Sequence, residues 1–418
     1  MLSEEIKEFL LKEATDRFFR YVQIWTTSDE DSQSNPSSKN QFDLGNVLSA
    51  ELKELNLENI IHDEYGYVYA DLPASNGLEN VKTIGLIAHM DTSPAVSGKN
   101  VKPVVHKNYD GSEIKFVSNK EIELTVEDSP LLKEYIGLDI ITSEGDTLLG
   151  ADDKAGIAEI MAACAAWKSF PELKHGPVTV CFTPDEEIGK GTLKIDKKRL
   201  PEFCYTMDGS EMGQLEFECF DAWKASITFT GLSVHPGYAK DLLVNAIHIA
   251  CRFLSEIPEH ESPEHTEERE GFYHLGDLRG TIEEAKIRLR IRDYNEKNNK
   301  RRMEFLQKLK DIYEFRYPGL KIELKFEHEY SNMLKFIEKE IKVVDLAKEA
   351  IKMADIDIKI ESIRGGTDGS KLSEMGIPTP NIFAGGLLFH SRKEHIPTLA
   401  LQKAAEVIIY LGQLWVAS

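Results

Sequence analysis

The sequence predicts an α/β protein in which a mixed central sheet is flanked by helices and a smaller α+β unit is inserted. Its 418 residues exceed the usual size of one hydrophobic core, so two domains are expected. Short apolar runs alternate with helical patterns in the first half of the chain, which is typical of βαβ architecture. This alternation stops near Glu218 and returns after Phe336, so we expect the second domain to interrupt the first.

The larger domain is assigned to residues 1–217 and 334–418. Its first part is predicted to contain an amphipathic N-terminal helix, a helix over 44–55, strands over 66–72 and 83–88, an irregular excursion over 95–145, a helix that opens at Asp152 and runs to 167, and strands over 178–183 and 203–207. Its second part is predicted to contain a helix over 343–353, strands over 356–360 and 378–383, and a last helix over 399–414. The polar stretch 27–40 is interpreted as a mobile surface loop, with a role near a functional site left open.

The inserted domain is assigned to residues 218–333. The patterns predict a strand over 223–230, a helix over 240–256, a long alternating strand over 280–292, a helix over 296–315 and a strand over 321–329. This succession of strands and helices is the outline of a ferredoxin-like α+β unit.

The composition excludes several classes of function. A formal net charge of −21 without a compensating basic stripe argues against nucleic-acid partners. No apolar run approaches the length of a membrane span, and the charged start lacks the basic region of a signal peptide. Five cysteines, an odd number inside apolar segments, indicate reduced and buried thiols. We therefore expect a cytoplasmic protein with neither a membrane nor a nucleic-acid partner.

Five segments place an acid or a histidine directly after an apolar run: 84–91, 148–154, 178–187, 203–209 and 381–390. Four of these runs are predicted to be buried strands, and side chains at the carboxyl ends of neighbouring strands can converge. Each such residue taken alone is more often a cap or a turn former. Together, however, their histidines and carboxylates form a donor set suited to zinc, and two ions sharing a bridging carboxylate would use all of them. The joint occurrence therefore favours a metal site.

The chain resembles the M20 family of co-catalytic zinc peptidases essentially from end to end. The most specific stretches are His89-Met-Asp-Thr-Ser-Pro94, 148–160 with its Ala-Asp-Asp-Lys sequence, and Phe182-Thr-Pro-Asp-Glu-Glu187. Further similar stretches are Val234-His-Pro-Gly237, 239–240, 261–263, 270–275 and Arg364-Gly-Gly-Thr-Asp-Gly369. The resemblance implies a zinc-peptidase catalytic domain and an inserted domain that acts as a lid or in dimerisation.

The resemblance also implies a ligand set for two zinc ions per subunit. Asp152 would bridge both ions, His89 and Asp208 would complete one, and Glu187 and His390 would complete the other. The paired ions would lower the pKa of a shared water, so that hydroxide is available near neutral pH.

Two further carboxylates have implied catalytic roles. Glu186 would be the general base, because adjacent side chains on an extended loop point apart and Glu187 can hold metal while Glu186 reaches the water. Asp91, two residues beyond His89, would accept the second imidazole N–H and fix its tautomer. Asp153 is interpreted as a cap of the helix that follows it.

Three residues are implied to contact the substrate. Arg292 and Arg364 would bind the terminal carboxylate of the peptide, since arginine suits bidentate carboxylate recognition. The inserted domain would have to close to bring Arg292 within reach. His235 would steady the developing oxyanion, and because some relatives supply this residue from a partner subunit, a homodimer is considered. The alternatives are ordinary surface ion pairs for the arginines and a surface turn for the histidine.

Two departures from the family pattern concern residues near the implied ligands. Leu388 and Ser391 flank Phe389-His390 where the family has asparagine and glycine, and Ser210 follows Asp208-Gly209 where a second glycine is more usual. Neither departure removes a ligand or the general base, but both bear on substrate contacts and loop shape.

The resulting functional prediction is a zinc-dependent tripeptide aminopeptidase that hydrolyses short peptide substrates with a di-metal-activated water. The alternatives are another M20-type dipeptidase, a carboxypeptidase or N-acyl-amino-acid deacylase and, from a different class, a non-catalytic metal-binding relative. An intact Glu186 argues against the last, because a binding-only protein needs no base beside its ligands.

Overall fold

The computed structural model describes all 418 residues, which form two compact units. Unit 1 comprises Met1–Phe217, Phe336–Glu361 and Thr367–Ser418, and unit 2 comprises Glu218–Lys335 and Ser362–Gly366. The short segment 362–366 was expected in the larger domain. It belongs to unit 2 because the Tyr294 hydroxyl donates to the carbonyl of Ser362 at 3.0 Å and Arg364 donates to carbonyls of the 266–270 segment.

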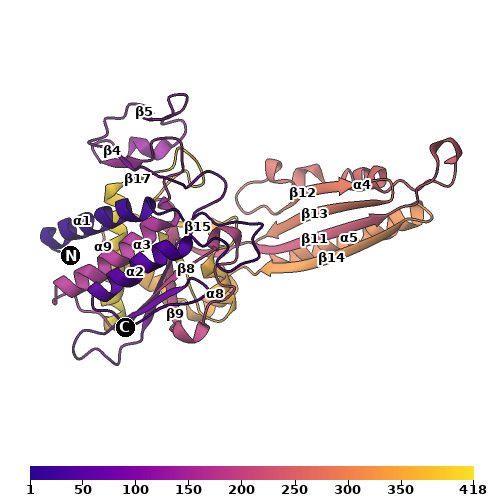
Figure 1. Cartoon of the computed structure of the whole chain (residues 1–418). Coiled ribbons are helices and arrows are strands. Elements are labelled where there is room, and N and C mark those ends of the chain that lie inside the picture. The colour runs from indigo at the N-terminus through magenta and orange to yellow at the C-terminus, as the bar shows by residue number, and fades with distance from the viewer. The chain divides into compact units, whose positions relative to one another are not determined.

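The core of unit 1 is an eight-stranded mixed sheet with strand order β1-β2-β8-β3-β9-β16-β10-β15. Figure 1 labels β8, β9 and β15 among its strands. The central strands β8, β3, β9 and β16 run parallel, and antiparallel pairs join β1, β2 and β10 to them. The bounds are β1 Glu58–His62, β2 Val68–Leu72, β3 Ile84–His89, β8 Val178–Thr183, β9 Phe203–Gly209, β10 Gln214–Cys219, β15 Lys359–Ile363 and β16 Asn381–Phe383. The predicted mixed central sheet is therefore confirmed.

Helices flank this sheet. α1 (Glu4–Val22), α3 (Ala151–Ser169) and α9 (Thr398–Ala417) pack against one another, and α3 lies on β3 and β9. Gly156 permits this close approach, because a Cβ at that position would meet the carbonyl oxygen of Met207 at 2.0 Å. The other helices of the unit are α2 (Gln41–Glu54), α7 (Lys342–Met353) and α8 (Asp368–Glu374), with the short α6 (Leu334–Ile337) at the junction of the two units.

The excursion over 95–145 contains short strands. β4 (Val104–His106) and β7 (Ile140–Thr142) form a three-stranded sheet with β17 (His395–Pro397), and β5 (Ile114–Lys115) pairs with β6 (Glu123–Leu124). The pairing of β7 with β17 fixes the position of the segment that directly follows the 381–390 run.

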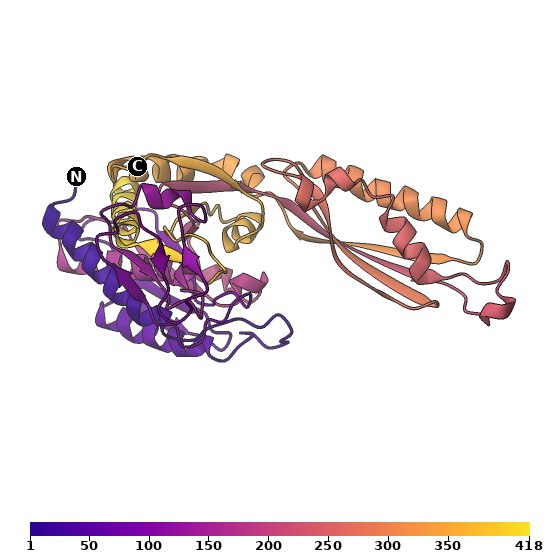
Figure 2. The same cartoon turned by 90° about the horizontal axis from the view of Figure 1, so that it is seen from above.

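Unit 2 has the order of elements β11-α4-β12-β13-α5-β14, and its four strands form an antiparallel sheet in the order β12-β13-β11-β14. Both helices lie along this sheet (Figure 2). Their side chains contribute to one hydrophobic core with those of all four strands. This is a ferredoxin-like arrangement. The bounds are β11 Asp221–Thr230, α4 Ala246–Leu254, β12 Phe272–Gly280, β13 Glu284–Asp293, α5 Glu296–Arg316 and β14 Lys321–Tyr330.

Several predicted elements were wrong in their extent, among them the strand expected over 378–383, which begins only at Asn381. The strand expected over 280–292 is β13, which begins only at Glu284, because a turn closed by a bond from the Thr281 N–H to the carbonyl of Glu284 at 2.7 Å precedes it. The strand before that turn, β12, was not predicted. The helix expected over 240–256 begins only at Ala246, because Asn245 caps it after a turn with Asp241 at φ +60°. The strand expected over 356–360 is β15, three residues later, since Asp355 at φ +60° first ends the preceding helix.

Four of the five cysteines are buried free thiols, as expected, whereas Cys251 is exposed because it lies on the outer side of α4. No helix combines the length and the apolar character that a membrane crossing requires.

Glu159 lies in the middle of α3 and is completely buried, with no hydrogen-bond partner for either carboxylate oxygen. Burial raises the pKa of Glu159 well above its usual value. A carboxyl group whose pKa is higher in the folded than in the unfolded protein stabilises the fold fully at a pH below its unfolded-state pKa. This stabilisation is lost as the pH rises through the folded-state pKa.

We therefore expect Glu159→Met to raise the free energy of unfolding by about 1–3 kcal/mol near pH 8 and by less near pH 5. Urea unfolding of both proteins at the two pH values measures this difference. Glu406→Met is the control, since Glu406 is equally buried but accepts from Gln402 and pairs with Lys403. If Glu159→Met raised the free energy of unfolding equally at both pH values, the raised pKa of this carboxyl group would be contradicted.

Candidate metal centre

The five ligand-type residues singled out in the sequence lie together in unit 1. His89 ends β3 and Asp208 lies at the end of β9. Glu187 lies in the 3-10 turn η2 (Glu186–Ile188) that follows β8. Asp152 lies at the start of α3, and His390 lies in the loop after β16. Because β3, β8 and β9 are parallel neighbours, their carboxyl ends meet at one edge of the sheet.

Asp152 occupies the centre of this cluster. Its Oδ1 is 2.8 Å from His89 Nε2, and its Oδ2 is 3.1 Å from His390 Nε2, so each carboxylate oxygen faces a different imidazole. Glu187 Oε2 lies 2.7 Å from His390 Nε2, and Asp208 Oδ1 lies 3.5 Å from His89 Nε2. The arrangement therefore has two halves joined by one carboxylate.

The donor set fits divalent cations. Ligand atoms of His89, Asp152 and Glu187 lie within 4.8 Å of one another, as do those of His89, Asp153 and Asp208. Imidazole nitrogens and carboxylate oxygens are suitable ligands for zinc and similar ions. Glu187 Oε1 is buried without a hydrogen-bond partner, so it needs a polar or ionic neighbour. The cluster is thus a candidate metal site.

Asp153 has a different role from its neighbour. Its Oδ1 accepts from the backbone N–H of Gly156 at 3.2 Å, the contact expected of a helix cap, and its Oδ2 accepts from the N–H of His89 at 3.1 Å. Both oxygens are therefore used to join the start of α3 to the end of β3.

Asp91 connects three parts of the centre and is completely buried. Its carbonyl lies 3.1 Å from His89 Nδ1, and its Oδ1 lies 3.4 Å from the same nitrogen. Its two carboxylate oxygens also accept from the backbone N–H groups of Glu186 and Glu187, at 2.9 and 3.2 Å. One buried carboxylate thus sets both the orientation of His89 and the backbone of the Glu-Glu pair.

The carboxylates of the cluster outnumber its two imidazoles. Burial and the nearby Asp152 carboxylate raise the pKa of Glu187 to about 8, and burial with the nearby Asp208 carboxylate raises the pKa of Glu186 well above its usual value. Hydrogen bonds to Asp152 and Glu187 raise the pKa of His390 to about 10. These shifts describe an environment that favours added positive charge.

Glu394 is a site residue that the sequence analysis missed. It is buried, and its carboxylate accepts from four consecutive backbone N–H groups: Leu149 at 2.7 Å, Gly150 at 2.9 Å, Ala151 at 2.7 Å and Asp152 at 3.2 Å. Its position four residues after His390 was the only signal in the sequence. The contacts fix the backbone that presents Asp152.

We expect Glu394→Gln to weaken metal binding roughly 10- to 100-fold while the protein stays folded, because an amide NH₂ would face two N–H donors. Competition with a chromophoric chelator measures the affinity, and circular dichroism monitors the fold. The control is Glu406→Gln on α9, which removes a buried carboxylate elsewhere in unit 1. Unchanged affinity in Glu394→Gln would remove Glu394 from the support of the site.

The polar stretch 27–40 lies against the metal centre. Near its start, the Ser28 N–H donates to the carbonyl of Thr92 at 3.2 Å. Near its end, the Ser37 N–H donates to Asp185 Oδ2 at 2.7 Å, and Gln41 Nε2 donates to Asp185 Oδ1 at 2.7 Å. Thr92 follows Asp91, and Asp185 precedes Glu186. The stretch is therefore attached to both segments that carry the candidate catalytic carboxylates.

The residues that depart from the family pattern have structural roles in the loop of His390. Ser210 Oγ donates to the carbonyl of Gly386 at 2.9 Å, and Ser391 Oγ donates to the carbonyl of Leu388 at 2.7 Å. Leu388 adopts φ +54°, a conformation that asparagine tolerates better than leucine. Ser210 and Ser391, which stand where the family usually has glycine, thus fix the loop through side-chain hydrogen bonds.

The three predicted substrate contacts lie in unit 2. Arg292 pairs with Glu329 at 2.6 Å and is largely buried. Arg364 donates to Glu270 O at 3.1 Å and to Thr266 Oγ1 at 3.2 Å, with its guanidinium over the rings of Phe220 and Phe272. His235 lies on the exposed turn before η4 (Pro236–Tyr238), where its Nδ1 accepts from the N–H of Gly237 at 3.1 Å.

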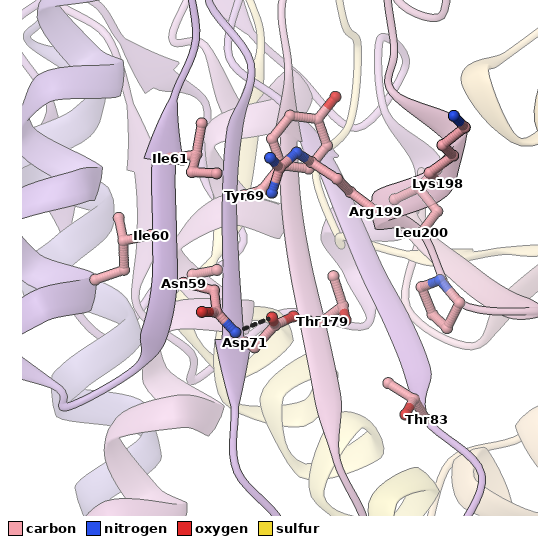
Figure 3. A pocket seen from close by; sticks show the side chains of 12 residues that line it. Asn59, Ile60, Ile61, Tyr69, Asp71, Thr83, Thr179, Lys198, Arg199 and Leu200 are labelled. Atoms are coloured by element: carbon pink, nitrogen blue, oxygen red, sulfur yellow. Dashed lines mark hydrogen bonds between the residues drawn. The ribbon is translucent and has the colours of Figure 1, made fainter.

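Two cavities of unit 1 differ in their relation to the centre. A hollow of about 580 Å³ is lined by Glu187, His390 and residues of the 28–31 and 93–95 segments. A second cavity of about 650 Å³ lies over β1, β2 and β8 and is lined by Asn59, Tyr69, Asp71, Thr179, Arg199 and others (Figure 3). In it Asp71 accepts from Asn59 and Thr179, at 3.0 and 2.9 Å, and no residue of the metal cluster takes part. Of these two cavities, only the hollow of about 580 Å³ adjoins the candidate ligands.

The fold and the metal cluster together indicate the protein family to which the chain belongs. The model of the peptidase family M20/M25/M40 matches residues 144–413, more than half of the chain. The chain belongs to this peptidase family, and the resemblance predicted from the sequence is confirmed.

Individual members of this family are similar to the chain over almost its whole length. The chain is 46% identical to Peptidase T from Listeria welshimeri serovar 6b over 413 residues, which cover 98% of this chain and 99% of that protein. Among solved structures, it is similar to a tripeptidase from Staphylococcus aureus subsp. aureus mu50, with a TM-score of 0.77, 22% identity and coverage of 98% and 99%. It also resembles a Bacillus subtilis protein described as a dinuclear metal binding peptidase from the M20 family, with a TM-score of 0.65, 13% identity and full coverage of both chains.

Proposed function

We propose that this protein is a zinc-dependent aminopeptidase that removes the N-terminal residue of tripeptides. The observation that carries the proposal is the placement of Asp152, whose two oxygens face His89 Nε2 at 2.8 Å and His390 Nε2 at 3.1 Å. A carboxylate in this position suits a bridge between two cations. The close relation to proteins named Peptidase T supports the choice of substrate class.

In this proposal Asp152, His89 and Asp208 would hold one zinc ion, and Asp152, Glu187 and His390 would hold the other. When bound, the two ions would supply Lewis-acid activation of the attacking water and of the scissile carbonyl.

Residues of the chain itself would orient the site and transfer the proton of the attacking water. Asp91 holds the backbone of Glu186 and Glu187 in place, and the side chain of Glu186 forms no hydrogen bond, so it is available to the reactants. Glu186 would accept a proton from the attacking water and deliver it to the departing amine nitrogen. His89 would be kept in one tautomer by its contacts with Asp91, because its Nδ1–H then has an acceptor.

The direct test is hydrolysis of alanine peptides of two, three and four residues by zinc-loaded protein, followed by liquid chromatography. We expect release of free alanine from the N-terminus, with the tripeptide hydrolysed most efficiently. Chelator-treated protein is the control. Preference for the dipeptide, or for an N-acetylated amino acid, would favour the dipeptidase or deacylase alternative. Absence of hydrolysis with both ions bound would favour a non-catalytic relative.

Arg292 and Arg364 are proposed to bind the terminal carboxylate of the substrate, which would let the enzyme measure peptide length. We expect Arg292→Ala and Arg364→Ala to lower kcat/KM for a tripeptide roughly 10- to 150-fold, which corresponds to about 1.5–3 kcal/mol of lost transition-state stabilisation, and to abolish the preference for the free acid over its C-terminal amide. Arg279→Ala is the control, because Arg279 is an exposed arginine of the same unit paired with Asp277. Full retention of the acid preference in both variants would assign length selection to other residues.

A further inference from the structure

The turn that carries the candidate general base Glu186 is too short to be fixed by regular secondary structure. β8 ends at Thr183, and the 3-10 turn η2 has only three residues. Asp185 before it and Gly189 after it both adopt left-handed backbone conformations, at φ +58° and φ +68°. The bonds of the strand ladder end before this turn begins, so the position of Glu186 depends on contacts made by individual side chains.

Helix α8 contacts the chain on both sides of this turn. Asp368 Oδ2 accepts from the Thr183 hydroxyl at 2.7 Å, and Lys371 Nζ donates to the carbonyl of Gly189. The backbone of Gly191 passes so close that an added Cβ would lie 2.2 Å from Asp368 Oδ1. Thr183 is completely buried, and Asp368 is only 4% exposed. One buried carboxylate thus contacts the chain before and after the turn.

The start of α8, where Asp368 lies, is itself held firmly. Thr367 Oγ1 accepts from the Ser370 N–H at 3.3 Å, and the Thr367 N–H donates to Ser370 Oγ at 3.1 Å, which is a capping box. Gly369 packs against the segment before β16, since a Cβ there would lie 2.6 Å from the carbonyl oxygen of Thr379. Asp368 is therefore presented by a fixed part of unit 1.

The position of a general base controls its rate of proton transfer. Such a base must lie within hydrogen-bond reach of the proton that it removes, and a displacement of about 1 Å can lower a rate roughly 100-fold. The side chain of Glu186 forms no hydrogen bond, so its position is set by its backbone. Asp91 holds the N–H of residue 186, and the bond from Thr183 to Asp368 holds the strand end from which the turn starts.

We propose that Asp368 is a positioning residue that fixes Glu186 through the Thr183 hydroxyl and the backbone of the 189–191 segment. This role rests on the proposed aminopeptidase function and adds to it a support for the general base. Because Asp368 acts through other residues, its loss should lower kcat rather than change KM.

The main test is Thr183→Val, which keeps the size and the β-branched shape of the side chain but removes its hydroxyl. We expect kcat for trialanine to fall roughly 10- to 100-fold, with KM within about twofold of wild type and an unchanged zinc content. Thr183→Ser keeps the hydroxyl and should recover most of kcat. Thr179→Val is the matched control, because Thr179 lies on the same strand and donates to another carboxylate, Asp71 Oδ1, at 2.9 Å. It should retain the kcat of wild type.

A second variant tests whether the two side chains act as one contact. Asp368→Ala should lower kcat in the same direction as Thr183→Val. The double variant Thr183→Val, Asp368→Ala should have the kcat of Asp368→Ala alone, since the hydroxyl then has no carboxylate to bind.

Hydrogen–deuterium exchange provides a measurement that does not depend on catalysis. The N–H groups of Glu186, Gly189 and Lys190 all donate to acceptors in or beside the turn, so exchange over 184–191 in metal-free protein reports how firmly the turn is held. We expect faster exchange over 184–191 in Thr183→Val, and the exchange of wild type in Thr183→Ser and Thr179→Val.

The proposed role of Asp368 is overturned if Thr183→Val keeps the kcat of wild type, or if its exchange over 184–191 is unchanged. It is also overturned if Thr183→Ser loses as much kcat as Thr183→Val, or if Thr183→Val loses zinc in proportion to kcat. Failure of the proposed function has a different signature, namely no turnover of any peptide by wild type. In that case the exchange result still decides whether Asp368 holds the turn.

Discussion

Asp152→Ala is expected to reduce bound zinc from two ions to one or none per chain and to abolish peptide hydrolysis. In wild type each ion would have three protein ligands, and Asp152 is the ligand that both share. Without it each half keeps only a histidine and one carboxylate, which is fewer than the three protein ligands of a typical catalytic zinc site. Elemental analysis after extensive dialysis measures the metal content, and a peptide assay measures turnover.

The control for this variant is Asp63→Ala, which removes an aspartate of the same unit that accepts from the backbone N–H groups of Tyr65 and Tyr67. It should retain both ions. Two tightly held ions in Asp152→Ala would show that this carboxylate does not bridge the two halves of the centre.

Glu186→Gln is expected to retain both ions and to lose turnover by roughly 10²- to 10⁴-fold, because only the proton acceptor is removed. The backbone of residue 186 should stay in place, since it is held through its N–H by Asp91 rather than through its side chain. Metal analysis combined with kcat at saturating tripeptide separates the two effects.

The adjacent Glu187→Gln gives the contrasting result. It should lower metal content, because Glu187 contacts His390 at 2.7 Å and has an unpaired buried oxygen. Near-full activity of Glu186→Gln with two ions bound would exclude Glu186 as the general base.

The strands of unit 1 were predictable because their patterns are simple. The run over 178–183 consists of β-branched residues with one cysteine and one phenylalanine, and β8 has those bounds. β12 was missed because its sequence contains Gly276 and Asp277, where a bulge shifts the register against β13. The bulge interrupts the period-two alternation by which a strand is recognised in sequence.

The candidate ligands were predictable for a similar reason, since each follows an apolar run and parallel strands bring their carboxyl ends together. Glu394 and Asp185 were not predictable, because their partners are distant in sequence. Glu394 bonds to backbone N–H groups of 149–152, and Asp185 bonds to Ser37 and Gln41. A carboxylate that accepts from backbone leaves no periodic pattern in the sequence. Such supports become visible only in the folded structure.

The short turn from His390 to Glu394 acts as a spacer of fixed length. One end carries a candidate ligand, and the other end holds the backbone that presents Asp152 to that same half of the centre. Surface loops elsewhere in the chain can change length with little consequence, since loop entropy varies slowly with length. Insertion of one residue between Ser391 and Lys393 would instead move the two attachment points relative to each other. The number of residues in this turn is therefore as restricted as the identity of the ligands themselves.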